Sequence, residues 1–508
     1  MELRRIHSAL ISIFDKNGID PILKKFHDLD IKIYSTGGTL EYIKKQGYEA
    51  ESVEDITEFP SILDGRVKTL HPKIFGGLLA KRGFDHRVQL ERHDIPEIDC
   101  VIVDLYPFEN TLTKTDNHEE IIEKIDIGGI SLIRAAAKNF FDVVVVPSKN
   151  EYTGFLETIS KSNGFTNLEQ RKWFAGRAFS ISAHYDTVIG AYFNKGFEKK
   201  DFQISIKSEN VLRYGENPHQ KAKYFGDLDA VFKNLGGKEI SFNNMVDIDA
   251  AMSLITEFDA NEPTIAILKH TNPCGVASRP TINEAWKDAL NCDPQSAFGG
   301  IIISNQNIDL ATAKEINDIF YEVLIAPSYD EDALTLLTSA KKRSILQYDD
   351  IVRPKLQYKS LFSGVIVQDS DNKQVTSNEF SYVTNLQPKP NEVEDLLFAN
   401  KCVKHLKSNA IAIAKNRQLI GIGTGQTSRV DALNQAILKA QTFHFDLNGS
   451  ALASDAFFPF ADCVGISAKA GITAIIQPGG SIRDQDSIDL CNEQNISMVF
   501  TGIRHFKH

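Results

Sequence analysis

The fold of the first part of the chain is decided by Ser8-Ala-Leu-Ile-Ser-Ile-Phe14, a short apolar run typical of a buried strand. A helical pattern follows at residues 19–29, and a second strand pattern at residues 31–34 leads into the turn Ser35-Thr-Gly-Gly-Thr39. Further buried strands are predicted at residues 100–103 and 143–146. Because strands alternate with helices, we predict a parallel sheet that is covered on both faces.

A charged segment separates this part from the rest of the chain. After a long helical pattern at residues 168–193, the stretch Lys195-Gly-Phe-Glu-Lys-Lys-Asp201 is typical of an exposed boundary. We therefore predict one domain at residues 1–198 and a second at residues 199–508. The 508 residues correspond to three units of roughly 150 residues each, so the second region has room for two.

Two segments of the second region look alike. Residues 264–270 form a predicted strand that leads into the turn Asn272-Pro-Cys-Gly275 and then a helix. Residues 410–416 form another strand, which leads into the turn Gly421-Ile-Gly-Thr-Gly425 and then a helix. This similarity predicts an internal duplication of one α/β unit.

Composition narrows the class of protein. The chain is 42% hydrophobic and 24% charged, as globular proteins are, and its formal net charge of -11 argues against nucleic acid as the main partner. The six cysteines have no CxxC spacing, which indicates a reducing compartment rather than a disulfide framework. The apolar run at residues 9–14 is too short for a signal peptide, and nothing is long enough to span a membrane. We expect a cytoplasmic protein with no membrane partner.

Basic residues are concentrated in three loops that contain glycine or proline. These loops are Gly65-Arg-Val-Lys-Thr-Leu-His-Pro-Lys73, Leu212-Arg-Tyr-Gly-Glu-Asn-Pro-His-Gln220 and Ile503-Arg-His-Phe-Lys-His508. In an acidic chain such loops suit small anions better than polymers, although solvated loop charge is the alternative for each one.

Two glycine-containing turns could also bind anions. Residues 35–39 lie between a strand and a helix, where backbone N–H groups converge; the alternative is a plain turn with Thr39 as helix cap. Asp126-Ile-Gly-Gly-Ile-Ser131 opens a helix that carries Arg134 and Lys138 on one face. A bound anion would relieve the repulsion between those two cations, and a solvent-facing stripe is the alternative.

The pair Lys269-His270, at the end of a predicted strand, is the sharpest local candidate for catalysis. A histidine can act as a general base near neutral pH, and a neighbouring ammonium can stabilise developing negative charge; a structural histidine is the alternative. Residues 421–425 do not complete a dinucleotide-binding GxGxxG, because Gln426 stands at the last glycine. Pro273-Cys274 lacks the second cysteine of a zinc deaminase, since position 277 is Ala277, so we expect no required metal.

Taken together, these motifs resemble, over essentially the whole chain, the bifunctional purine biosynthesis family that joins AICAR formyltransferase to IMP cyclohydrolase. The motifs of the first part are residues 65–72, Leu105-Tyr-Pro-Phe108, Ile125-Asp-Ile-Gly-Gly129 and Arg134-Ala-Ala-Ala-Lys-Asn139. Those of the second are residues 213–220, Leu268-Lys-His-Thr-Asn-Pro-Cys-Gly275, Ser296-Ala-Phe-Gly-Gly300, Gly425-Gln-Thr-Ser-Arg429, Ser454-Asp-Ala-Phe-Phe-Pro-Phe460 and residues 504–508.

The resemblance implies an α/β fold with a methylglyoxal-synthase-like cyclohydrolase domain, followed by two cytidine-deaminase-like α/β units that form the formyltransferase domain. It implies 10-formyltetrahydrofolate as formyl donor, the small-molecule substrates AICAR, formyl-AICAR and IMP, and a homodimer with transformylase sites at the interface. It further implies a cytoplasmic enzyme of the last two steps of IMP synthesis.

The resemblance also assigns residues to the two reactions. For formyl transfer, His270 relays the amine proton, Lys269 gives acid or electrostatic help, and Asn409 supports them. The residues implied to bind nucleotide or folate there are Arg213, Tyr214, Phe298, Gly300, Arg429, Phe457, Pro459, Asp462, Arg504, Phe506 and His508. For ring closure, the implied catalytic residues are Lys68, Tyr106, Asp126 and Lys138, and the implied substrate-binding residues are Ser12, Lys16, Ser35, Thr36, Gly37, Gly38, Thr39, Arg66 and Thr69.

Three positions depart from the family pattern. Phe14 replaces a usual serine, Asp104 a usual asparagine and Phe75 a frequent histidine. None removes a proposed catalytic group, so we expect activity with altered nucleotide affinity. A non-catalytic nucleotide sensor on the same fold is the second hypothesis, and the retained Lys138, Lys269 and His270 argue against it. A zinc deaminase is the third.

Overall fold

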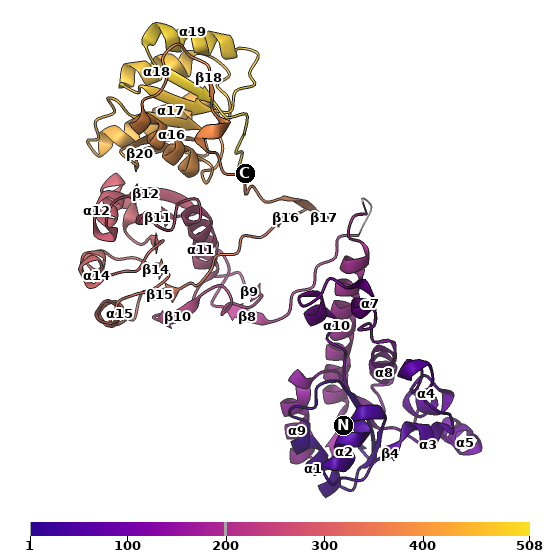
Figure 1. The fold of residues 1–508 in the computed structure, drawn as a ribbon. Helices are drawn as coiled ribbons and strands as arrows, with labels where there is room; N and C mark the ends of the chain where they lie inside the picture. The colour runs from indigo at the N-terminus through magenta and orange to yellow at the C-terminus, as the bar shows by residue number, and fades with distance from the viewer. Residues whose placement is uncertain (1, 198–200) are drawn as a thin grey trace. The chain divides into compact units, whose positions relative to one another are not determined.

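The computed structural model describes residues 2–197 and 201–508, which form two compact units divided between Ile206 and Lys207 (Figure 1). The predicted boundary between residues 198 and 199 lies outside the described residues. The assignment of one reaction to each of the two predicted domains stays a prediction. In the described part of the chain, no helix is both long and apolar enough to cross a membrane.

The first unit contains the predicted parallel sheet. Five strands lie in the order β4-β3-β2-β5-β6, and every neighbouring pair is parallel. The strands are β2 (Ser8–Ile13), β3 (Lys32–Ser35), β4 (Glu51–Ser52), β5 (Cys100–Asp104) and β6 (Val144–Val146), while β1 (Arg4–Arg5) pairs separately with β7 (Phe165–Thr166). The central strand β2 is buried on both faces, which explains its continuous apolar sequence.

Among the described residues of this unit, ten helices and two short 3₁₀ turns surround the sheet. The helices are α1 (Asp20–Asp28), α2 (Gly37–Lys45), α3 (Val53–Thr57), α4 (Pro72–Leu79), α5 (Phe84–Arg92), α6 (Phe108–Leu112), α7 (His118–Ile122), α8 (Ile127–Lys138), α9 (Tyr152–Lys161) and α10 (Leu168–Phe193), and the 3₁₀ turns are η1 (Leu63–Gly65) and η2 (Lys149–Glu151). Helix α8 packs on β5 and β6, and α10 packs on α8. Asn167 and Gln170 form a capping box that fixes the start of α10.

The second unit is built on one mixed sheet of twelve strands in the order β10-β15-β14-β13-β11-β12-β20-β19-β21-β22-β23-β18. The strands of its first half are β10 (Lys233–Gly236), β11 (Thr264–Lys269), β12 (Asn272–Ser278), β13 (Ile301–Ser304), β14 (Val323–Ala326) and β15 (Ser344–Gln347). Those of its second half are β18 (Ser381–Tyr382), β19 (Ile411–Lys415), β20 (Gln418–Gly423), β21 (Ala451–Ser454), β22 (Ala474–Gln477) and β23 (Ser497–Phe500).

The helices of the two halves cover the sheet in the same way. They are α11 (Phe242–Ile255), α12 (Ile282–Cys292), α13 (Pro294–Ala297), α14 (Leu310–Asn317) and α15 (Glu331–Thr338) in the first half, and η3 (Ser377–Glu379), α16 (Pro390–Val403), α17 (Arg429–Thr442), α18 (Asp462–Ala470) and α19 (Asp484–Gln494) in the second. Residues of α11 and α16 share one core with both halves of the sheet, whereas on the other face each half has its own core.

The two halves therefore repeat one topology, as the predicted duplication requires. Each begins in the chain with an edge strand and a helix, continues with an antiparallel hairpin at the centre of the sheet, and then adds helices and parallel strands outward from the centre. The two ends of the sheet have the same arrangement, since the edge strand of each half, β10 or β18, is antiparallel to its neighbour. The likeness of each half to cytidine deaminase stays a prediction.

The predicted turns at residues 272–275 and 421–425 are wrong in detail. Residues 272–275 begin strand β12, and Gly421 and Gly423 lie in β20. The chain reverses earlier, at His270-Thr271 and at Asn416-Arg417, where φ is 52° and 63° in the first pair and 53° and 54° in the second. Positive φ at both positions is the geometry of a tight two-residue hairpin turn.

The glycines that suggested turns have another purpose. A Cβ atom on Gly275 would lie 1.9 Å from the carbonyl oxygen of Ala289 on α12, and one on Gly423 would lie 1.8 Å from that of Ala432 on α17. Glycine is therefore required for each helix to pack closely on its hairpin. Helix–strand packing, rather than turn formation, therefore explains the glycines at these positions.

Two small antiparallel hairpins complete the second unit. One joins β8 (Glu209–Leu212) to β9 (Ala222–Phe225), and the other joins β16 (Leu356–Leu361) to β17 (Gly364–Asp369). All residues of β16 and β17 are exposed, and Figure 1 shows this hairpin extending away from the helices of its own unit. The surface loop predicted at residues 368–378 begins in β17 and ends in η3.

Candidate active sites

The first candidate site lies where the parallel strands β2, β3 and β5 end, at the edge of the sheet where α/β folds usually bind ligands. Asp126 caps α8, and its Oδ1 accepts a hydrogen bond from the Gly129 amide at 2.6 Å. Burial raises the pKa of Asp126, although the Gly129 and Tyr106 amides and the Lys68 charge oppose the shift. Burial also raises the pKa of Tyr106, and the nearby Asp126 adds to it. Asp126, Tyr106 and Lys68 thus form one electrostatic cluster.

The basic loop at residues 65–73 contributes two side chains to this cluster. The Lys68 ammonium lies 3.7 Å from the position that a Cβ atom on Gly37 would take. The Thr69 hydroxyl lies 3.1 Å from the corresponding position on Gly128, in the first turn of α8. Because these two glycines have no side chain, the basic loop can lie close to both the turn at Gly37 and the start of α8.

Lys16 brings a second ammonium to the same place. Its Nζ donates to the carbonyl oxygens of Ile13 at 2.7 Å and Phe14 at 3.0 Å. Burial lowers the pKa of Lys16, and the Lys68 charge lowers it further, while Asp104 and Asp15 act in the opposite direction. Two interacting ammonium groups in one partly buried site are suited to an anionic ligand.

The hydroxyls of the glycine turn point into the protein. Ser35 donates to the Ile11 carbonyl at 2.8 Å, and Thr39 donates to the Ile13 carbonyl at 2.9 Å. Thr36 donates to Glu54 at 3.0 Å and is the N-cap residue of α2, so Thr39 is not the cap. The groups that remain for a phosphate are the backbone N–H groups at Gly37 and Gly38, at the start of a helix.

Three predicted residues of this site lie apart from the cluster or have other contacts. Lys138 is exposed at the far end of α8, twelve residues and about 18 Å along the helix from Asp126. Arg66 is exposed and pairs with Glu123. Ser12 is half-buried on β2, beside Val103 of β5.

The positions that depart from the family pattern lie around the same edge. The Phe14 ring meets the Tyr106 ring edge-on at 5.6 Å, and the Lys124 ammonium lies 6.0 Å from the Phe14 ring. Asp104 accepts the Asp15 amide at 3.0 Å, and burial raises its pKa. Phe75 packs against the core of the unit.

The second candidate site surrounds the turn between β11 and β12. Lys269 donates from Nζ to the Phe298 carbonyl at 2.7 Å, and His270 is exposed at the tip of the turn. Asp247 on α11 accepts the Thr271 amide at 2.7 Å. Burial raises the pKa of Asp247, while hydrogen bonds from the Thr271 and His270 amides and the His270 charge oppose the shift. One carboxylate therefore holds the turn that presents His270.

Asn409 belongs to a buried polar network beside this turn. Its side chain donates to the Gln426 carbonyl at 3.0 Å and accepts from Arg429 at 3.0 Å. Arg429 also pairs with the buried Asp455, whose other oxygen accepts from Ser408 at 2.5 Å. Arg429 is thus placed to orient Asn409, and its predicted contact with substrate stays a prediction.

A chain of hydrogen bonds connects the turn to that network. The Asn272 side chain donates to the His270 carbonyl at 2.8 Å and accepts from Thr424 at 3.2 Å, and the Gly425 amide donates to the Lys407 carbonyl at 2.7 Å. Lys407 is two residues from Asn409. The structure therefore places Lys269, His270 and Asn409 in one region of the second unit.

The predicted ligand-binding side chains of this unit are mostly exposed, as contacts for a ligand must be. The Arg504 guanidinium stacks on Phe506 at 4.4 Å, and that of Arg213 lies 5.5 Å from the Tyr214 ring. Phe298 is 60% exposed. The other members are Gly300, whose missing side chain leaves room for the Leu268 carbonyl, Phe457 and Pro459 after β21, Asp462 at the start of α18, and the exposed His508.

Sequence reasoning missed Asp247 and Asp455. Neither lies in a basic loop or next to a predicted catalytic residue, and their partners are 24 and 47 residues away. In the zinc-deaminase-like pair Pro273-Cys274, burial raises the pKa of Cys274 to about 12, and its thiol donates to the Ile267 carbonyl. Within the described ranges, no three His, Cys, Asp or Glu side chains are grouped as they would be around a metal ion.

Comparison with known proteins gives a consistent result. Residues 136–439 match the AICARFT/IMPCHase bienzyme family, and residues 18–131 match the MGS-like domain. The chain is 55% identical over 508 residues to the bifunctional purine biosynthesis protein PurH of Bacteroides thetaiotaomicron, with 100% of both chains covered. It is 46% identical to PurH of Chlorobaculum parvum, with 99% of both covered, and 47% identical to PurH of Aquifex aeolicus, with 98% of this chain and 100% of that protein covered.

Proposed function

Because the chain belongs to the AICARFT/IMPCHase bienzyme family, we propose that it carries out the last two steps of IMP synthesis, as AICAR formyltransferase and IMP cyclohydrolase. The observation that carries this conclusion is the full-length agreement with PurH at 55% identity. The first reaction moves a formyl group from 10-formyltetrahydrofolate to the amine of AICAR. The second closes formyl-AICAR to IMP with loss of water.

In formyl transfer, the AICAR amine attacks the formyl carbon, and the tetrahydrofolate nitrogen leaves with a proton. The attacking amine must lose a proton as the new C–N bond forms, and His270 at the exposed tip of its turn is the group proposed to relay it. Lys269 would stabilise the oxyanion, while Asn409 is oriented by Arg429 at 3.0 Å. Arg213, Tyr214, Arg504 and Phe506 would hold the nucleotide, with Phe298, Gly300, Phe457, Pro459, Asp462 and His508 around the two substrates.

In ring closure, the carboxamide nitrogen attacks the formyl carbon, and the former formyl oxygen leaves as water. This reaction needs groups that can exchange protons near neutral pH. Asp126 is the candidate for this exchange, because burial raises the pKa of its carboxyl, and Lys68 supplies positive charge beside it. Tyr106 belongs to the same cluster, where Asp126 contributes to the raised pKa of its hydroxyl. Lys16 and the turn at Gly37-Gly38 would bind the phosphate, while Lys138 and Arg66 would have to act from outside this cluster.

A homodimer with shared formyltransferase sites is part of the same proposal. The exposed hairpin β16–β17 supports it, because an isolated two-stranded hairpin is marginally stable in water. Its exposed apolar side chains include Val365, Ile366 and Val367, and Phe362 at its tip is fully exposed. A second copy of the chain would cover them. The six unpaired cysteines suit a reducing compartment, and we place the protein in the cytoplasm.

The test is a coupled assay on the full chain. AICAR and 10-formyltetrahydrofolate should give IMP and tetrahydrofolate, followed by absorbance. His270→Ala should abolish formyl transfer and leave cyclisation of supplied formyl-AICAR intact. Asn416→Ala is the matched control, because Asn416 occupies the same place in the second hairpin turn and should keep both activities. Nucleotide binding without any turnover by the unmodified chain would refute the enzymatic function and favour a sensor.

A further inference from the structure

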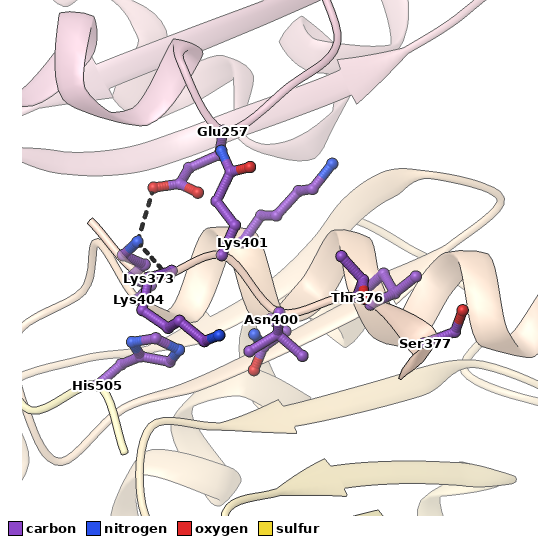
Figure 2. Close-up of a pocket in the computed structure, with 11 residues that line it drawn as sticks. Glu257, Lys373, Thr376, Ser377, Asn400, Lys401, Lys404 and His505 are labelled. Carbon is purple, nitrogen blue, oxygen red and sulfur yellow. Dashed lines mark hydrogen bonds and ion pairs between the residues drawn. The ribbon is translucent and has the colours of Figure 1, made fainter. Parts of the chain in front are cut away.

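The exposed hairpin β16–β17 is anchored at both ends on one buried carboxylate, Glu257. On the incoming side of the hairpin, Arg353 pairs with Glu257 at 2.9 Å. On the outgoing side, Lys404 pairs with Glu257 at 3.0 Å and donates to the Lys373 carbonyl at 2.8 Å. Figure 2 shows Lys404 linked to both of these partners, with His505 near them. The segment that follows the hairpin is therefore held in a fixed place.

Asp371, in that segment, pairs with the C-terminal tail. Its Oδ2 lies 2.7 Å from Nδ1 of His505, a residue that is 134 positions away in the chain and only 2% exposed. Burial alone would raise the pKa of Asp371, but the hydrogen bond from His505 and the Lys404 charge lower it. Asp371 is therefore a carboxylate near neutral pH. Because a carboxylate only accepts hydrogen bonds, Nδ1 of His505 carries the donated hydrogen whatever the charge on the ring.

The tail alternates between exposed and buried side chains around that pair. Arg504 and Phe506 are exposed on either side of the buried His505. The Arg504 guanidinium stacks on the Phe506 ring at 4.4 Å, so these two side chains form one exposed unit. The imidazole is thus buried against Asp371, while its two neighbours in the chain face outward, where the proposed function places them on the nucleotide.

Backbone hydrogen bonds also hold the tail, and they do not depend on Asp371. The His505 amide donates to the Asp455 carbonyl at 3.0 Å, and the Ser408 amide donates to the Lys507 carbonyl at 2.9 Å. These bonds fix the path of the main chain, whereas the contact with Asp371 fixes the side chain of His505. Loss of the Asp371 carboxylate should therefore loosen the tail without unfolding the unit.

We propose that Asp371 is a positioning residue for formyl transfer, acting through its hydrogen bond with His505. The bond holds the neighbouring Arg504 and Phe506 where they can contact the nucleotide. This inference rests on the proposed function, because that function assigns Arg504 and Phe506 to the nucleotide. Since these two side chains are proposed to bind the nucleotide rather than to move a proton, a displaced tail should weaken nucleotide binding and leave the chemical step largely intact.

The test compares three variants of the full chain. Asp371→Ala removes the acceptor, whereas Asp371→Asn keeps an acceptor oxygen for the His505 Nδ1–H and removes the charge. Glu379→Ala is the matched control, because it removes another carboxylate from the same segment, one that pairs with Lys373 at 3.4 Å. The measurements are kcat and KM for AICAR at saturating 10-formyltetrahydrofolate, and hydrogen exchange of the backbone amides of residues 503–508. Urea unfolding checks that each variant is folded.

We expect Asp371→Ala to raise KM for AICAR about tenfold, with kcat changed less than about threefold and faster hydrogen exchange in the tail, since a charge-assisted hydrogen bond is lost. Asp371→Asn should recover part of this loss, and Glu379→Ala should match the parent chain. An unchanged KM in Asp371→Ala, or an equal rise in Glu379→Ala, would overturn the proposal while leaving the proposed function intact. Absence of formyl transfer by the parent chain would instead refute the proposed function, and the role of Asp371 with it.

Discussion

Asp247 is predicted to be a positioning residue for formyl transfer, and the duplicated fold supplies its own control. Asp395 on α16 accepts the Asn416 amide at 2.9 Å and the Arg417 amide at 2.6 Å, as Asp247 does for the turn that carries His270. Burial raises the pKa of both carboxyls. The perturbation is therefore Asp247→Asn against Asp395→Asn, the same chemical change in two equivalent turns.

The expected magnitudes follow from the hydrogen bonds. An asparagine keeps one acceptor oxygen, so one amide loses its partner at a cost of about 1–3 kcal/mol. Against this, burial that raises a pKa means that the charge is held at a cost at neutral pH, and the substitution removes that cost. We expect both variants to lose about 1–2 kcal/mol of unfolding free energy. Only Asp247→Asn should also lower kcat for formyl transfer, by about tenfold to a hundredfold, as His270 leaves its position.

The assay combines urea unfolding with kcat and KM for formyl transfer, and cyclisation of formyl-AICAR serves as an internal control. KM should change less than kcat, because His270 is proposed to relay the amine proton during the reaction step rather than to bind the nucleotide. If both variants lower kcat equally, the effect is loss of structure and the reasoning fails. It fails equally if Asp247→Asn loses stability yet retains full kcat.

Three further predictions concern other parts of the chain. Lys68→Met should reduce ring closure about a hundredfold and Lys138→Met much less, because Lys68 and not Lys138 lies beside Asp126; equal losses in the cyclisation assay would contradict this. Gly423→Ala should destabilise the second unit by more than about 2 kcal/mol in urea, since its Cβ would meet the Ala432 carbonyl, whereas Gly38→Ala, which meets nothing within 4 Å, serves as the tolerated control. Burial alone would raise the pKa of Glu257, but the hydrogen bond from His405 and the charges of Lys404 and Arg353 lower it to about 2. Its stabilisation is therefore complete above the ordinary value of 4.5 and is lost as pH falls toward 2, and Glu257→Gln should flatten the acid limb of the unfolding free energy by a few kcal/mol.

The elements with a strong local pattern could be predicted from sequence. The helix predicted at residues 168–193 is α10 with the same bounds, because a capping box marks its start. The apolar strands β2 and β5 were equally clear, since burial on both faces leaves continuous apolar runs. Local propensity predicts turns at residues 272–275 and 421–425, where the structure has parts of β12 and β20. The glycines there meet helices that lie later in the chain, and local propensity cannot reveal that contact.

The residues of the candidate sites also differ in whether local sequence could reveal them. Lys269 and His270 could be found because they are adjacent and end a strand, and the basic loop with Lys68 could be found by its composition. Asp247 could not be found in this way, because its role depends on a hydrogen bond to a residue 24 positions away, in a turn that local propensity places at residues 272–275 instead of 270–271. His505 could be placed in a basic tail, but its pairing with Asp371 depends on the packing of a segment 134 residues earlier in the chain.

The repeated hairpin has a different role in each half of the second unit. Lys269 and His270 at one turn correspond to Lys415 and Asn416 at the other, so the same turn geometry occurs twice while the imidazole is present once. At the second turn, Arg417 forms an ion pair with Glu262 of the first half, so this turn helps to join the two halves. The same hairpin geometry therefore presents the proposed catalytic histidine in one half of the unit and joins the two halves in the other.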